Sequence, residues 1–196
     1  MEGGVGSWLL LLDFDGVITR LDLDWGKIRE EVGRAVGRRI SSLNEFFEES
    51  YGTDEFAVAH SIVESHELEA IKNAKPIDEA VALLRASKAP VMISTMQSER
   101  AVGEFLVING LDKHVDEILG RPRFGSKEAQ FAWVEREKGY RPKDVLFVDD
   151  SMRNISKCMK FGFCCVLMRG EVLRLITELA GSSRDNPCDA ISQRAR

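Results

Sequence analysis

Short runs of apolar residues recur along this chain, and longer amphipathic segments separate them. The first run consists of four leucines at residues 9–12 and ends abruptly at Asp13 and Asp15. A short, unbroken apolar run that ends in polar residues is typical of a strand buried on both faces. Further runs, some of them weaker, lie at residues 91–95, 115–119, 145–150 and 164–167. The pattern therefore predicts strands at these five places.

Segments with apolar residues three or four positions apart predict helices between the strands. After the second strand, such segments span about residues 98–110, 126–139, 152–160 and 171–179. Strands that alternate with helices are typical of a parallel sheet with helices on both faces and right-handed crossovers. We therefore predict an α/β fold whose sheet domain comprises residues 7–20 and 76–180.

The stretch between the first two strands differs from the rest, because it contains helices and no strand. Trp25 begins one amphipathic helix, and Ser42 and Thr53 fit the N-cap positions of two more. We expect residues 21–75 to form a small helical subdomain that is inserted into the sheet domain. Pro76 fits the first position of the helix that resumes the core.

Composition limits the possible classes of function. The 196 residues carry a formal net charge of -5, which argues against a protein that binds nucleic acid. The apolar stretch before Asp13 is too short for a signal peptide or for the ~20 residues of a membrane span. We therefore expect a cytoplasmic monomer or homodimer with no nucleic-acid or membrane partner. Residues 181–196 are polar and are expected to form a flexible C-terminal tail.

The four cysteines show no Cys-x-x-Cys spacing. They are Cys158, Cys164, Cys165 and Cys188. Because side chains alternate along a strand, the adjacent Cys164 and Cys165 should point to opposite faces of the sheet. We interpret all four as reduced, structural residues.

Polar residues follow several strands at the edge where a ligand would bind. The carboxyl ends of parallel strands meet at one edge of a sheet, and ligands bind beyond that edge. The residues expected there are Asp13, Asp15, Ser94, Asp149 and Asp150, with Lys127 beside them. Two carboxylates as close as Asp13 and Asp15 require a cation between them or a proton on one of them. Without His or Cys in the cluster a Ser-His-Asp mechanism is excluded, and Asp residues with Mg²⁺ indicate phosphoryl transfer.

The order of these residues resembles a known family. Asp13-Phe14-Asp15-Gly16-Val17, then Ser94, Lys127 and Asp149-Asp150, are similar to the four motifs of the haloacid dehalogenase-like phosphatases. The resemblance covers about residues 7–179. It implies a Rossmann-like core and a helical cap between the first two motifs, as in phosphoglycolate phosphatase-like members. The insertion at residues 21–75 stands at the position of this cap.

The resemblance also implies a role for each motif residue. Asp13 corresponds to the nucleophile that forms an aspartyl phosphate, and Asp15 corresponds to the general acid and base. Lys127 corresponds to the lysine that pairs with the nucleophile and the phosphate. The expected phosphate-binding residues are Ser94, Thr95, Lys127 and Gly16, and the expected Mg²⁺ ligands are Asp13, Asp15 through its backbone carbonyl, Asp149 and Asp150.

Three positions depart from the pattern of the family. Thr95 follows the hydroxyl of the second motif where many relatives have Asn or Gly, and Lys127 is not followed by the common proline. Asn154 stands where a further Asp is common. These departures leave the reaction intact, but they leave open whether Asp149 or Asp150 is the main metal ligand of the pair. We favour Asp150.

Together these features predict a Mg²⁺-dependent phosphatase that acts on a small phosphorylated metabolite, such as phosphoglycolate or a sugar phosphate. Two alternatives stay open, namely a phosphomutase that uses the same phosphoaspartate and a non-catalytic phosphate-binding regulatory module. An intact Asp15 argues against the module, because binding alone needs no acid there. The arginines considered for contact with an anionic leaving group are Arg20, Arg34, Arg38 and Arg39, and the same question applies to Arg121 and Arg123.

Overall fold

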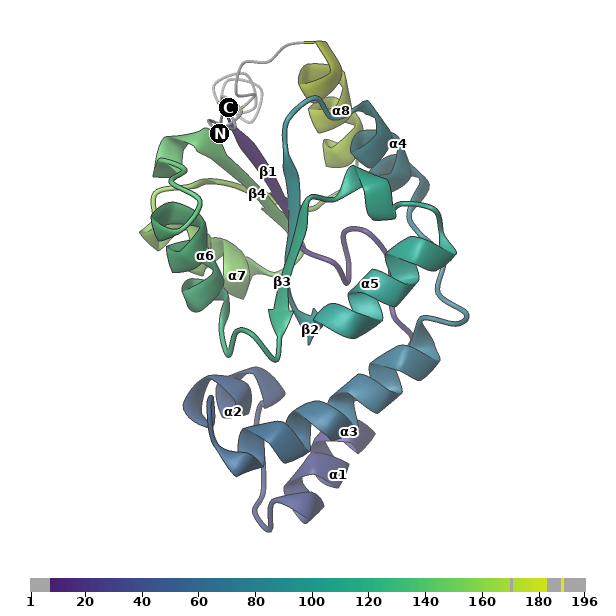
Figure 1. The fold of residues 1–196 in the computed structure, drawn as a ribbon, viewed down its shortest axis with the longest axis vertical. Helices are drawn as coiled ribbons and strands as arrows, with labels where there is room; N and C mark the ends of the chain where they lie inside the picture. The colour runs from purple at the N-terminus through teal and green to yellow at the C-terminus, as the bar shows by residue number, and fades with distance from the viewer. Residues whose placement is uncertain (1–7, 170, 183–187, 189–196) are drawn as a thin grey trace.

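The computed structural model of the protein describes residues 8–169, 171–182 and 188. At its centre lies a five-stranded sheet in which all neighbouring strands are parallel (Figure 1). Across the sheet the strands are β3 (Glu117–Arg121), β2 (Val91–Ser98), β1 (Leu9–Leu12), β4 (Val145–Asp149) and β5 (Cys164–Leu167). The predicted α/β fold with a parallel sheet is confirmed, and the strand that ends at Asp13 lies in the middle of it.

Helices cover both faces of the sheet (Figure 1). One face carries α6 (Lys127–Arg136) and α7 (Met152–Lys160), and the other carries α4 (Asp78–Ala86), α5 (Glu99–Ile108) and α8 (Val172–Ser182). Side chains alternate along β1. Leu9 and Leu11 therefore pack under α6 and α7, and Leu10 and Leu12 pack under the helices of the opposite face. All four leucines are fully buried, which explains why the strand is an unbroken apolar run.

Three helices between β1 and α4 form a helical insertion (Figure 1). They are α1 (Trp25–Ala35), α2 (Leu43–Glu49) and α3 (Asp54–Ala70). The insertion has an apolar core of its own, which includes Val32, Phe47 and Phe56. Ser42 and Thr53 cap α2 and α3, since their side chains accept hydrogen bonds from backbone N–H groups in the first turn. The helical insertion therefore lies as a separate layer beyond the ends of β2 and β3.

Three element boundaries differ from the expectation. The helix α4 begins at Asp78, because Pro76 instead forms an isolated bridge with Thr19 where the two connections to the helical insertion run side by side. The strand β2 continues to Ser98 through a shift of register against β3. The strand β3 begins at Glu117, because the chain leaves the 3₁₀ turn Asp112–His114 only two residues earlier. The hydrophobic pattern of the sequence thus located these strands and this helix, but it missed boundaries that depend on contacts with neighbouring segments.

The expectation of reduced cysteines is wrong. Cys165 is bonded to Cys158 of α7, and Cys164 is bonded to Cys188. The two cysteines of β5 do face opposite cores, as alternation predicts. Cys158 packs in the same core as Cys165, and Cys188 packs against the same core as Cys164. Such pairing follows from tertiary packing, and sequence spacing gives no sign of it.

The longest described helix, α3, has 17 residues. No helix in the described part of the chain combines the length and the apolar character needed to span a bilayer. The predicted C-terminal tail, residues 181–196, lies outside the described residues except for 181, 182 and 188.

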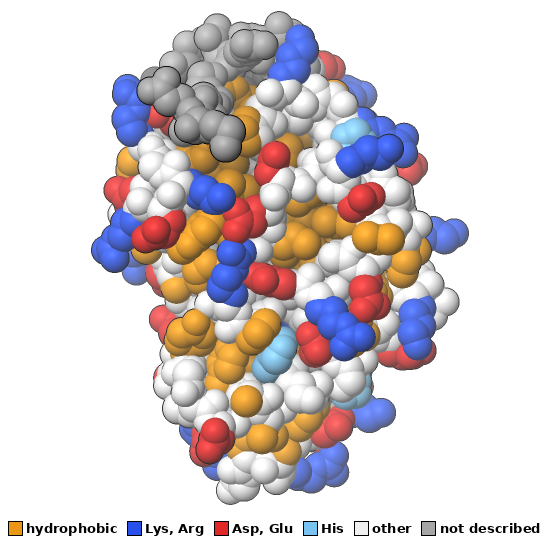
Figure 2. All heavy atoms as spheres, in the orientation of Figure 1, with side chains coloured by type: hydrophobic (Ala, Val, Ile, Leu, Met, Phe, Trp, Pro, Cys, Tyr) orange, Lys and Arg blue, Asp and Glu red, His pale blue; other side chains and the backbone are white. Residues whose placement is uncertain are grey.

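Charged side chains of both signs share the surface. On the face shown in Figure 2, Lys and Arg side chains lie among Asp and Glu side chains. In the described part of the chain, ion pairs such as Arg123–Glu117 and Lys157–Glu128 join side chains of opposite charge. Among the described residues on that face, no basic stripe of the kind that follows a nucleic-acid backbone is present.

Candidate active site

Asp13, Lys127 and Asp149 form a buried charged cluster at the carboxyl edge of the sheet. Asp13 follows β1, Lys127 is the first residue of α6, and Asp149 ends β4. The Lys127 ammonium donates a hydrogen bond to Asp13 Oδ1 at 2.8 Å and lies 3.3 Å from Asp149 Oδ2. One cation therefore stands between two carboxylates that would otherwise repel each other.

Burial shifts the pKa values in this cluster. It raises the pKa of Asp13 to about 7, although the positive charge of Lys127 acts in the opposite direction. Burial alone would lower the pKa of Lys127, but the negative charges of Asp13 and Asp149 outweigh it and raise that pKa above its ordinary value. Lys127 therefore stays protonated at neutral pH, and the Asp13 carboxyl is the group in this pair that titrates near neutrality.

The first turn of α7 orients the acidic pair Asp149-Asp150. The Asp149 carboxylate accepts hydrogen bonds from the backbone N–H of Ser151 at 2.8 Å and from the Asn154 amide at 2.9 Å. Asn154 thus acts as a donor, a role that an ionised Asp at this position could not fill. Asp150 is exposed, and desolvation together with the charge of Asp149 raises its pKa.

Asp13, Asp149 and Asp150 have the geometry of a cation site. Each offers one carboxylate oxygen, and these oxygens all lie within 4.8 Å of one another. Oxygen ligands of this kind suit a hard divalent cation such as Mg²⁺ or Ca²⁺. The side chain of Asp15 is not among these grouped ligand atoms of the described residues.

Asp15 and Gly16 lie beside this group, at the start of the connection to the helical insertion. Asp15 Oδ1 accepts a hydrogen bond from the backbone N–H of Leu21 at 2.8 Å. Burial raises the pKa of Asp15. Gly16 has φ +86°, and a Cβ at this position would collide with the Asp150 carboxylate. Glycine is therefore required here both by its backbone conformation and by the close approach of Asp150.

Ser94 and Thr95 lie next to Lys127, but their side chains are fully buried. The carbonyl oxygen of Ser94 accepts a hydrogen bond from Lys127 Nζ, while its hydroxyl donates to Gln130 Oε1 at 2.5 Å. Gln130 also donates to the carbonyl oxygen of Thr95 at 2.7 Å. Sequence reasoning missed Gln130. Its position three residues after Lys127, on the same face of α6, is the signal that could have indicated it.

A cleft of about 400 Å³ separates the helical insertion from the edge of the sheet. Its lining comprises Asp13, Asp15, Trp25, Arg29, Ser41, Ser42, Leu43, Asn44, Phe47, Val63, Glu67, Met96, Gln97, Arg121, Lys127, Asp150 and Asn154. Acids and Lys127 line the sheet side, and aromatic and polar residues line the side of the insertion. Cavities of this size and mixed lining are typical of small-molecule sites.

Of the six arginines considered from the sequence, Arg121 is among the residues that line this cleft in the described part of the chain, and the other five are not. Arg20 lines a separate hollow of about 850 Å³. Arg34, Arg38 and Arg39 line an outer hollow of about 910 Å³ on the helical insertion. Arg29, which sequence reasoning did not single out, lines both the outer hollow and the cleft. It lies four residues after Trp25, so both share one face of α1.

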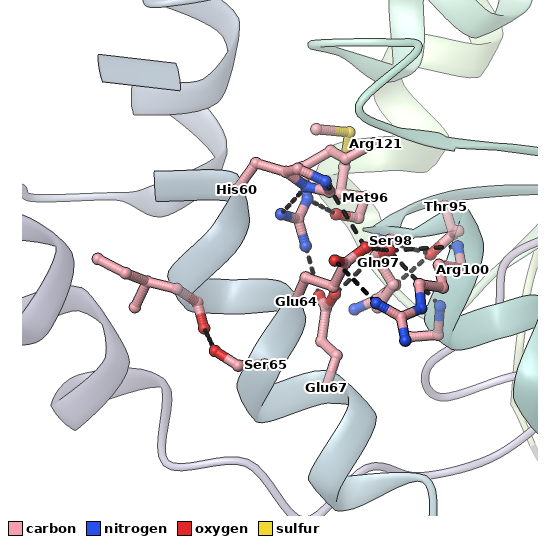
Figure 3. A network of polar contacts seen from close by, with 12 residues as sticks. His60, Glu64, Ser65, Glu67, Thr95, Met96, Gln97, Ser98, Arg100 and Arg121 are labelled. Atoms are coloured by element: carbon pink, nitrogen blue, oxygen red, sulfur yellow. Dashed lines mark hydrogen bonds and ion pairs between the residues drawn. The ribbon is translucent and has the colours of Figure 1, made fainter. Parts of the chain in front are cut away.

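A second set of charges lies where α3 meets the ends of β2 and β3 (Figure 3). The Arg121 guanidinium donates to Glu67 at 2.5 Å, and both side chains are fully buried. Arg121 also donates to the carbonyl oxygen of Met96 and to His60 Nδ1, the latter at 3.2 Å. The backbone N–H of Ser98 donates to Glu67 at 2.9 Å. This network fastens the helical insertion to the sheet along one wall of the cleft.

The sequence matches the family model of the haloacid dehalogenase-like hydrolases over residues 26–168, which is more than half of the chain. The chain belongs to this family. The match includes the Asp149-Asp150 pair and begins after Asp13 and Asp15. The match confirms the family that the sequence motifs of this hydrolase had indicated. No curated protein matches the sequence significantly.

Solved structures share the fold of this hydrolase. A predicted phosphatase from Clostridium acetobutylicum has a TM-score of 0.64 at 18% identity, and the match covers 95% of this chain and 99% of that one. A predicted phosphoglycolate phosphatase from Haemophilus somnus 129pt has a TM-score of 0.58 at 20% identity and coverage of 84% and 85%. CbbY from Rhodobacter sphaeroides, solved in complex with phosphate, has a TM-score of 0.58 at 15% identity and coverage of 83% and 86%. At these identities the likeness shows the fold alone.

Proposed function

We propose that this hydrolase is a Mg²⁺-dependent phosphatase that hydrolyses small phosphate monoesters through an aspartyl phosphate. The observation that carries the proposal is the position of Asp13. Its carboxylate contacts Lys127 at 2.8 Å, belongs to the group of acid oxygens with Asp149 and Asp150, and lines the cleft of about 400 Å³. A carboxylate so placed suits nucleophilic attack on a phosphorus atom held in that cleft.

The Mg²⁺ ion would be held by Asp13, Asp149 and Asp150, with the backbone carbonyl of Asp15 as a further ligand. A donor set of oxygens without His or Cys favours Mg²⁺ over transition metals. When bound, the cation offsets the charges of the acids and the phosphate and polarises a phosphoryl oxygen. The side chains of this chain supply the remaining chemistry.

The proposed phosphate-binding residues are those expected from the sequence, namely Lys127, Gly16, Ser94 and Thr95. Lys127 is the one whose side chain lines the cleft and carries a positive charge. The Ser94 hydroxyl is engaged by Gln130, so Ser94 would contact phosphate only after this hydrogen bond is exchanged. Lys127 therefore contributes most of the protein's own attraction for the phosphate.

In the first step, a carboxylate oxygen of Asp13 forms a bond to phosphorus and the bond from phosphorus to the leaving-group oxygen breaks. Lys127 favours the ionised form of Asp13, which is the form that attacks. Asp15 gives its proton to the departing oxygen. The raised pKa of Asp15 favours the protonated form that this step requires.

In the second step, Asp15 acts as a carboxylate and takes a proton from a water molecule. The water oxygen forms a bond to phosphorus, and the bond from phosphorus to Asp13 breaks. Inorganic phosphate leaves, Asp13 is again ionised and Asp15 again carries a proton. The two carboxyl groups thus complete the cycle without any His or Cys.

The names of structural neighbours support the same class of reaction. Two of them are described as predicted phosphatases, and a third was solved with phosphate bound. Their low identity to this hydrolase makes them support for the class of reaction and not for a particular substrate.

A panel of phosphate monoesters, incubated with the protein and Mg²⁺, tests the proposal through release of inorganic phosphate. We expect turnover of at least one small ester and no turnover by Asp13→Asn. Isomerisation of a sugar phosphate without net release would indicate a phosphomutase instead. Binding of phosphate without any reaction would indicate a regulatory module.

A further inference from the structure

Three cationic side chains line the cleft in the described part of the chain, namely Arg29, Arg121 and Lys127. Each could in principle attract an anionic part of a substrate. Whether it can do so depends on the carboxylates and carbonyl groups that already occupy its N–H donors. The three residues differ sharply in this respect.

The N–H donors of Arg121 and Lys127 already bind acceptors within the protein. Arg121 is fully buried and donates to Glu67, to His60 and to the carbonyl oxygen of Met96 (Figure 3). Its guanidinium also lies over the Phe47 ring at 4.4 Å. Its charge is matched by that of Glu67. Lys127 stands between Asp13 and Asp149, which belong to the proposed reaction centre. Neither residue is available for the leaving group of the substrate.

Arg29 is different, because the only hydrogen bond of its guanidinium to a described residue goes to the carbonyl oxygen of Ser41 at 3.4 Å. None of the ion pairs between described residues includes Arg29. A guanidinium has five N–H donors, so most of those of Arg29 face solvent or the cleft. The neighbouring Arg38, by contrast, is paired with Glu55 at 2.8 Å.

The lining near Arg29 combines apolar and polar groups. Trp25 lies one turn earlier on the same face of α1, and Leu43 and Met96, which are partly exposed, also line the cleft. Ser41, just before α2, and Asn44, in the first turn of α2, add polar groups. A ligand that fills the cleft would therefore meet Asp13, apolar side chains and the Arg29 cation.

We propose that Arg29 binds a second anionic group, a carboxylate or a phosphate, at the end of an apolar leaving group of the substrate. This inference rests on the proposed phosphatase function, which places the scissile phosphate at Asp13. Arginine suits the task because its planar guanidinium pairs with either anion through two parallel hydrogen bonds. The substrate class would then be phosphate monoesters whose leaving group is itself an acid.

Matched aryl phosphates test the inference. The probes are 4-carboxyphenyl phosphate, its neutral analogue 4-carbamoylphenyl phosphate, and 1,4-phenylene bisphosphate. We expect the protein to prefer the carboxylate or the bisphosphate over the carbamoyl ester by about ten- to hundred-fold in kcat/KM, as for a charge-assisted contact. The preference should lie in KM, because the contact is the same in the substrate and the transition state.

The variant Arg29→Gln should bring this ratio close to one, and Arg29→Lys should restore part of it. Arg34→Gln is the matched control, since Arg34 lines the outer hollow but not the cleft, and it should keep the ratio of the unmodified protein. Equal rates on all three esters, or a preference that survives in Arg29→Gln, would overturn the inference while the phosphatase function stands. Failure to hydrolyse any ester would overturn both.

Discussion

The Arg121 guanidinium donates a hydrogen bond to the Glu67 carboxylate at 2.5 Å, and neither side chain is exposed to solvent. Glu67 belongs to α3 of the helical insertion and Arg121 ends β3 of the sheet. Burial raises the pKa of Glu67 and lowers the pKa of Arg121, and each partner's charge acts against that effect. Each charge is therefore tolerated inside the protein only because the other is present.

Removal of one of these charges should destabilise the protein strongly. We expect Glu67→Gln to lower the free energy of unfolding by about 3–5 kcal/mol, because it leaves the Arg121 charge buried without a partner. Glu55→Gln is the control, since Glu55 forms an exposed ion pair with Arg38, and it should cost less than about 1 kcal/mol. Urea unfolding measures both values. A loss in Glu67→Gln no larger than that in Glu55→Gln would contradict the assigned role.

His60 should make the stability depend on pH. Its pKa is lowered from the ordinary 6.5 by burial and then by the positive charge of Arg121, whose guanidinium is 3.2 Å from His60 Nδ1. The unfolded chain therefore binds this proton more tightly than the folded protein does. The contribution of neutral His60 is fully present above pH 6.5 and is lost as the pH falls toward the lowered pKa.

We expect the contribution of His60 to the free energy of unfolding to fall on acidification below this point, by at most about 1.4 kcal/mol per pH unit for one proton. Asp13, whose pKa is raised to about 7, contributes in the opposite sense over the same range, so the comparison between the unmodified protein and a His60 variant isolates the effect. Urea unfolding between about pH 5 and 7.5 measures the slope. His60→Gln should reduce it, because the amide oxygen still accepts from Arg121 without taking up a proton. His114→Gln, which removes a histidine outside this network, should keep the slope of the unmodified protein. An unchanged slope in His60→Gln would rule the assignment out.

Much of the fold could be predicted from the sequence because local pattern and tertiary burial agree. The leucines at residues 9–12 form an unbroken apolar run since both faces of β1 are covered. The gathering of Asp13, Asp149 and Asp150 could be predicted too, because parallel strands end at a common edge. These inferences needed only the order of elements and the handedness of their connections.

The remaining features depend on which distant surfaces meet. Glu67 and Arg121 are 54 residues apart, and nothing in the local pattern of either segment indicates the other. The direction of the Ser94 hydroxyl depends on Gln130, which α6 places beside β2. The disulfides depend on Cys158 and Cys188 reaching the two faces of β5. Contacts of this kind follow from packing and not from periodicity.

The two acids at the end of β4 should differ in what their removal does. Asp150 is exposed, whereas Asp149 is buried and accepts hydrogen bonds from Ser151 and Asn154. We expect Asp150→Asn to weaken Mg²⁺ binding and activity at least about tenfold, with a change in stability of less than about 0.5 kcal/mol. Asp149→Asn should also lower stability, because it removes one of the two carboxylates beside Lys127.

Titration calorimetry with Mg²⁺ and urea unfolding in EDTA separate these effects. The EDTA keeps any bound metal from contributing to stability. Chelation should also abolish turnover by the unmodified protein, and added Mg²⁺ should restore it. Full turnover in excess EDTA would show that the reaction at Asp13, Asp149 and Asp150 needs no divalent cation.

The roles of Asp13 and Asp15 can be separated through the two half-reactions. Asp13 forms the bond to phosphorus, so Asp13→Asn should abolish both turnover and any phosphoenzyme. Asp15 protonates the leaving group in the first step and activates water in the second. Asp15 is held by the Leu21 N–H and not by Lys127, so its replacement should leave the nucleophile in place.

With p-nitrophenyl phosphate, the phenolate leaves almost without help from an acid. Asp15→Asn should therefore still form aspartyl phosphate but hydrolyse it slowly, by about 10²–10⁴-fold. Rapid mixing should show a burst of p-nitrophenol, and labelled phosphate should appear on the protein in an acid-stable form that hydroxylamine removes. Alkyl esters should be slow in both steps. Normal turnover by Asp15→Asn, or labelling of Asp13→Asn, would show that these roles are assigned to the wrong residues.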